Sequence, residues 1–245
     1  MDGSIFSYGF QYGGMLIEAA LIIYVVQSSH RNRPSSVLLY LCCLLASGVA
    51  RSYTLHRFGY RSTQYSYVYF ATDFPLVISA LFLVCLFFRR ACLHQEKMWR
   101  YVRLWLTFIC VMVVGISGLF FSHHYGNVLT DFYVEFSQNV YFTCLVLNTL
   151  LYLLLQQIDS ADDQLGLLVC GVGIQFAGPA ATLALVHLMT RQGFAESLFE
   201  FTIPLCTLGM LLVWAYAIVR VEGRATKVTR HKAPVLAEVT ANLNV

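Results

Sequence analysis

Acidic side chains stand inside long apolar segments of this sequence, where an ionised group is costly. The four clearest cases are Glu18, Asp73, Glu135 and Glu200. Carboxylates at membrane depth are tolerated where another group pairs with them, and they commonly mark ion, proton or ligand sites. These four residues are therefore the starting points of a candidate site.

Polar residues at helical spacing extend this set, because residues three or four positions apart share one helix face. Tyr69 and Asp73 have this spacing, and Asn139 has it with Glu135. We expect Asp73 and Glu135 to share Arg51 or a bound cation, since isolated carboxylates would be costly at that depth. The predicted ligand-binding residues are Asp73, Glu135, Glu200, Gln138, Asn139, Tyr69, Arg51 and Glu18.

These residues leave several functions open. The favoured hypothesis is a non-enzymatic protein that binds a small molecule or lipid in the outer half of a helix bundle, as a sensor-like module or accessory subunit. A proton- or cation-coupled transporter is the first alternative, and a metal-dependent intramembrane lipid hydrolase is the second. An interfacial aromatic belt with hydrogen bonds between helices explains the same stripes equally well without any ligand.

The sequence contains no recognisable metal-binding or cofactor-binding motif. The 8 cysteines are scattered through the apolar segments, with no CxxC pair, and no HExxH face is present. Buried, unpaired cysteines usually act as small apolar side chains. We therefore predict no metal ligands, no cofactor and no catalytic residues.

Composition places these residues in a membrane protein. The chain has 245 residues, of which 58% are hydrophobic and 12% charged, whereas soluble domains carry about 25% charged residues. Long apolar runs predict spanning helices, because hydrocarbon offers the backbone no hydrogen-bond partner outside the helix. The seven predicted segments are 10–27, 37–53, 65–88, 104–121, 132–155, 165–189 and 198–219.

The predicted fold is an all-α polytopic bundle over residues 1–220, followed by a short basic tail over 221–245. The second segment is the shortest of the set and ends near Arg51, so a re-entrant segment is its alternative. Small residues in the sixth segment, such as Gly171 and Gly178, predict close packing against a neighbouring helix.

Basic residues indicate the orientation. All lysines and arginines except Arg51, Arg57, Arg61 and Arg191 fall on one side of the predicted bundle. Cytoplasmic loops keep the positive excess, so we expect the N-terminus outside and the C-terminus inside the plasma membrane. A net charge of +3 suits contact with anionic lipids better than binding of nucleic acid. Binding of a protein partner or of a second copy of the chain is a further possibility that the sequence leaves open.

The segments YSYVYFATDFPLVISALFLVCLFFRR and FSQNVYFTCLVLNTLLYLLLQ resemble uncharacterised bacterial seven-helix integral membrane proteins, including the sensory bundles that precede signalling domains. This resemblance covers most of the chain and implies a bacterial inner-membrane bundle. It transfers no specific function, because its motifs are apolar runs.

The charge bias predicts the position of the C-terminus. A reporter fused at Val245 should be active only in the cytoplasm, and fusions in successive loops should alternate as seven spans require. Accessibility of a Val245 tag from outside intact cells would overturn the orientation, and an even number of spans would overturn the count.

Overall fold

Every element in the described part of the chain is a helix. The computed structural model describes residues 2–27, 35–59, 62–93, 95–123, 128–157, 163–188 and 202–220. The helices are α1 (Asp2–Gln27), α2 (Ser35–Phe58), α3 (Thr63–Ala91), α4 (Glu96–His123), α5 (Val128–Gln157), α6 (Asp163–Leu188) and a further helix, Thr202–Arg220. The all-α bundle predicted from the sequence is confirmed.

Five of these helices are long and apolar enough to cross a membrane: α2, α3, α5 and Thr202–Arg220, and α4 over Glu96–Gly115. The apolar stretches described in α1 and α6, Tyr12–Gln27 and Asp163–Gly178, are shorter. The second predicted segment is a continuous helix of 24 residues, which is long enough to span and favours a spanning helix over the re-entrant alternative. The chain is a membrane protein by these helices.

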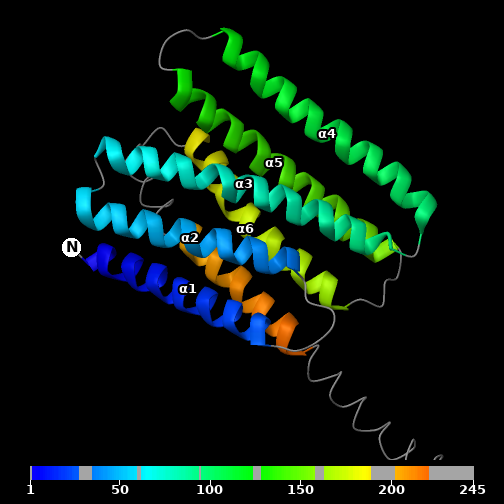
Figure 1. Ribbon diagram of the computed structural model, residues 1–245, viewed down its shortest axis with the longest axis horizontal. Helices are drawn as coiled ribbons and strands as arrows, with labels where there is room; N and C mark the ends of the chain where they lie inside the picture. The colour runs from blue at the N-terminus through cyan, green and yellow to red at the C-terminus, as the bar shows by residue number, and fades with distance from the viewer. Residues whose placement is uncertain are drawn as a thin grey trace, which may run out of the picture.

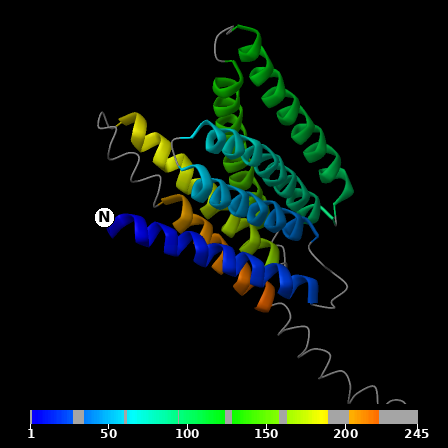
Figure 2. The same cartoon turned by 60° about the vertical axis from the view of Figure 1, so that its left-hand side comes forward.

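Helix α3 lies at the centre of the arrangement. It contacts α2, α4, α5 and α6, while α1 contacts α2. Figure 1 shows α3 between α2 and α5, with α4 at the edge of the bundle. In the second view, α1 and α2 again run side by side and α4 diverges from the other helices (Figure 2).

The side chains of the central helix α3 are more buried than those of the outer helix α4. The inward residues of α3 recur at helical spacing and are nearly all inaccessible: Leu76, Val77, Ala80, Leu83, Val84, Phe87 and Phe88. In α4, by contrast, Leu106 is buried while Leu104 and Trp105 are mostly exposed. An apolar helix exposed in this way must meet lipid or another protein, because water would not favour it.

Glycines bring α6 against the Thr202–Arg220 helix. A Cβ at Gly171 would lie 2.6 Å from Cδ1 of Trp214, and one at Gly178 would meet the Sγ of Cys206. The Trp214 side chain is fully buried, and its Nε1–H donates to the carbonyl of Leu168 at 3.0 Å. The predicted close packing of the sixth segment is confirmed, and the partner is this helix.

Substituting Gly171 tests this contact. Gly171→Ala should lower the free energy of unfolding by about 1–3 kcal/mol, because the buried indole of Trp214 cannot move without losing its hydrogen bond. Titration with a denaturing detergent, followed by tryptophan fluorescence, measures the change. The matched control is Gly166→Ala on the same helix, where a Cβ meets nothing within 4 Å. Equal stability of the two variants would contradict the packing.

Candidate functional site

A short connection places the end of α2 beside the start of α3. Gly59 follows α2 with φ +78°, a left-handed conformation that glycine adopts without strain. Ser62 then caps α3, because its Oγ accepts the backbone N–H of Tyr65 at 3.1 Å. The two helices therefore run antiparallel, and polar residues of their adjoining halves face each other.

Arg51 joins α2 to α3 through several contacts. Its Nη2 lies 3.0 Å from Oδ1 of Asp73 in a salt bridge, and its Nε donates to Oγ1 of Thr72 at 2.9 Å. Nη2 also lies 3.4 Å from the carbonyl of Tyr69, and the guanidinium carbon stands 4.1 Å from the centre of the Tyr69 ring. The cation thus binds a carboxylate, a hydroxyl and an aromatic face together.

Helix α5 completes the surroundings of Asp73. The hydroxyl of Ser137 donates to Oδ2 at 3.0 Å, and the hydroxyl of Tyr141 lies 3.4 Å from Oδ1. Ser137 and Tyr141 are spaced i, i+4, so both project from one face of α5. Asp73 is only 7% exposed. The buried carboxylate therefore has partners on two other helices, α2 and α5. Such partners are needed because a buried charge without them would be costly.

Backbone contacts hold the same region of α3. Pro75 lies inside α3 and has no N–H, so the carbonyl of Ala71 loses its helical donor. At the next carbonyl, that of Thr72, the Ser47 hydroxyl of α2 lies within hydrogen-bond distance at 3.2 Å. The Ser47 hydroxyl also donates to the carbonyl of Cys43 in its own helix at the shorter distance of 2.7 Å. Ser47 and Arg51 are spaced i, i+4, so one face of α2 lies against both the charge and the backbone of this turn.

The structure brings three of the predicted residues together: Arg51, Asp73 and Tyr69. Asn139 is half-buried on α5, two positions from Ser137 and hence on a different face. The side chains of Glu135 and Gln138, and the whole of Glu200, lie outside the described residues. The predicted sharing of Arg51 by Asp73 and Glu135 is thus seen for Asp73 alone, and ligand binding by the set stays a prediction.

Glu18 is a further buried acid, which makes no hydrogen bond to Arg51 or Asp73 among the described contacts. It is on α1, is 5% exposed, and its Oε2 has no hydrogen-bond partner among the described residues. A buried carboxyl without a partner is costly in its charged form. Glu18 is therefore a second buried polar residue of the core. It lies on α1, and α1 contacts α2.

Sequence reasoning missed two partners of the site, Ser47 and Ser137. Both are small hydroxyl residues, which are common in membrane helices and carry little signal alone. The available clue was spacing: Ser47 is i−4 from Arg51, and Ser137 is i−4 from Tyr141. In the described part of the chain, no three His, Cys, Asp or Glu side chains are grouped as metal ligands.

Comparison with models of known protein families, with curated proteins and with solved structures gave no match. The chemistry of the site therefore rests on its own geometry.

Substituting the two partners of the salt bridge should lower the stability by different amounts. Arg51→Ala leaves the buried Asp73 carboxylate without its cation and should lower the free energy of unfolding by about 3 kcal/mol. Asp73→Asn should cost less, because the amide keeps the shape and can still accept from Ser137. The double variant should cost less than the sum of the two single changes, because the second change removes a group already stranded.

Detergent-induced unfolding of the purified variants measures these differences. The control is Arg57→Gln, also on α2, whose Nη1 bonds only the exposed hydroxyl of Tyr53 among the described residues, at 2.8 Å; it should change stability by less than about 0.5 kcal/mol. Strict additivity of Arg51→Ala and Asp73→Asn would show that the pair does not act as a unit.

Proposed function

We propose that this chain is a multi-pass protein of the plasma membrane that binds a small molecule or lipid headgroup at Arg51 and Tyr69. In this proposal it acts as a sensor-like module or an accessory subunit, and ligand binding alters the contact between α2 and α3. The observation that carries the proposal is the incomplete use of the Arg51 guanidinium.

Arg51 keeps donor capacity for a ligand. Its Nε and Nη2 are engaged, whereas Nη1 donates to none of the described residues. The Arg51 side chain is 19% exposed and that of Asp73 11%. Both carboxylate oxygens of Asp73 already accept hydrogen bonds. An incoming cation would have to displace Arg51, whereas a ligand oxygen can add directly to Nη1, so a carboxylate, phosphate or carbonyl group is the favoured ligand chemistry.

Aromatic and polar residues surround this end of α2 and α3. Tyr69 is 36% exposed and its ring already stacks on Arg51. The hydroxyl of Tyr12 on α1 lies 2.6 Å from Nε2 of His56 further along α2, at an exposed position. The exposed part of the Tyr69 ring beside the guanidinium suits a ligand with both an apolar body and an oxygen-bearing group.

A ligand at Arg51 gives a physical route to signalling. A ligand changes a conformational equilibrium only through a difference in its affinity for the two states. An acidic ligand on Nη1 would draw the guanidinium away from Asp73, and so would bind better where α2 and α3 have shifted apart. Its binding energy would then favour the state with a loosened α2–α3 contact.

Glu18 favours a second candidate, proton- or cation-coupled transport. It is a core carboxyl with an oxygen that has no partner among the described residues, and such groups serve as proton carriers in transporters. It lies on α1 and is not one of the groups that contact Arg51.

Native mass spectrometry of the purified protein tests ligand binding. We expect a co-purifying small molecule or lipid on the wild type, with occupancy reduced about tenfold by Arg51→Lys or Tyr69→Leu, since a lost ionic or stacking contact is worth on the order of 1.4 kcal/mol. Arg57→Gln should leave occupancy unchanged. Equal occupancy in all variants would refute the site. A proton-driven flux in proteoliposomes that Glu18→Gln abolishes would favour transport instead.

A further inference from the structure

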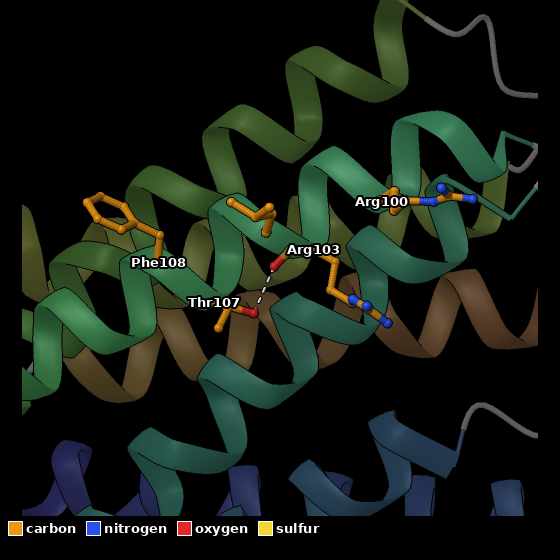
Figure 3. Close-up of a pocket in the computed structure, with 5 residues that line it drawn as sticks. Arg100, Arg103, Thr107 and Phe108 are labelled. Carbon is orange, nitrogen blue, oxygen red and sulfur yellow. Dashed lines mark hydrogen bonds between the residues drawn. The ribbon is translucent and has the colours of Figure 1, made fainter.

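Helix α4 presents two different faces. Leu106 is buried, and Val102, Ile109 and Val113 pack against the core at helical spacing. The opposite stripe lines a groove of about 410 Å³, shown in Figure 3. Its described lining residues are Arg100, Arg103, Leu104, Thr107 and Phe108.

Charge is concentrated at one end of this groove. Arg100 and Arg103 are spaced i, i+3 and both are exposed, and both side chains extend toward the end of α4 that joins α3 (Figure 3). Among the described residues, neither side chain makes a salt bridge. Thr107 lies one turn further on, where its hydroxyl donates to the carbonyl of Arg103 at 2.9 Å. The two cations thus face the groove without a counter-ion from the described residues.

Apart from Thr107, whose hydroxyl is bonded within its own helix, the rest of the stripe is apolar. Leu104 is 70% exposed, Phe108 53% and Val111 64%. From Arg100 to Val111 the helix therefore changes from two cations to a continuous apolar surface within about three turns. This order matches a phospholipid, whose phosphate lies at the interface while its acyl chain runs into the hydrocarbon.

We propose that the groove on α4 binds an anionic phospholipid. The phosphate lies between the guanidinium groups of Arg100 and Arg103, and one acyl chain runs along Leu104, Phe108 and Val111. Guanidinium groups bind phosphate oxygens through paired charge-assisted hydrogen bonds. The site is at the opposite end of α3 from the Arg51 network and stands independently of the function proposed there.

A second copy of the chain fits this groove less well. In a symmetric dimer the same patch meets itself at the same membrane depth. Arg100 and Arg103 would then face Arg100 and Arg103 of the other copy, and like charges so placed repel. Charge complementarity therefore favours an anionic lipid as the occupant.

Lipid titration of the full chain in detergent, read by native mass spectrometry, tests the proposal. The probes are a phosphatidylglycerol and a phosphatidylcholine with identical acyl chains. The wild type should bind one phosphatidylglycerol in preference to phosphatidylcholine, and the double variant Arg100→Gln/Arg103→Gln should weaken phosphatidylglycerol binding by about tenfold or more. Circular dichroism confirms that the variants keep their helices.

The matched control is Arg89→Gln, an exposed arginine near the end of α3 that does not line the groove. It should leave the preferred phosphatidylglycerol bound, and Phe108→Ala should weaken binding without abolishing the headgroup preference. Soluble glycerol phosphate should not compete at millimolar concentration, because it lacks the acyl chain. Equal effects of Arg89→Gln and the double variant, equal binding of both lipids, or a change of oligomeric mass in place of lipid binding would each overturn the proposal.

Discussion

A carboxylate in the interior of a membrane protein has to be paired, and the pairing of Asp73 determines how three helices meet. Arg51 approaches from α2 and neutralises the charge at Oδ1, while from α5 Ser137 donates to Oδ2 and Tyr141 lies near Oδ1. Each partner fixes the distance and the rotation of its own helix relative to α3. The packing of the bundle agrees with these contacts, because α2 and α5 are also the two main neighbours of the central helix α3.

The same network lies beside a turn of α3 that carries both a proline and a charge. Pro75 weakens the backbone hydrogen bonding of α3, and Asp73 adds a group that hydrocarbon disfavours. One face of α2 lies against this turn: Arg51 binds the carboxylate, and the Ser47 hydroxyl, which donates to the carbonyl of Cys43 at 2.7 Å, lies 3.2 Å from the carbonyl of Thr72. A functional site at Arg51 is therefore built on contacts that also hold the helices together, and loosening them would alter both.

Hydropathy predicted the number and order of the helices in the described part of the chain, but it located their ends less well. The fourth apolar run begins at residue 104, whereas α4 begins at Glu96, because the charged turn before Leu104 is helical without being apolar. Spacing indicated that Tyr69 and Asp73 share a face, and depth suggested Arg51 as a partner. The sequence pattern could not show which face of α5 points to Asp73. The acidic and amide stripe through Glu135 attracted attention, whereas the α5 contacts to Asp73 come from Tyr141 and from Ser137, whose small side chain looks like an ordinary packing residue.

The α2–α3 hairpin bears on how the chain enters its membrane. Arg51 and Asp73 are 22 positions apart and face each other across a short connection. Inserted one at a time, each would cost on the order of 3 kcal/mol at the centre of a helix. Inserted as a hairpin, they enter already neutralised, and this needs no residue of α5. The ion pair is thus local enough to form during synthesis, before Ser137 and Tyr141 have left the ribosome, so biogenesis can treat the two helices as a single membrane-crossing unit.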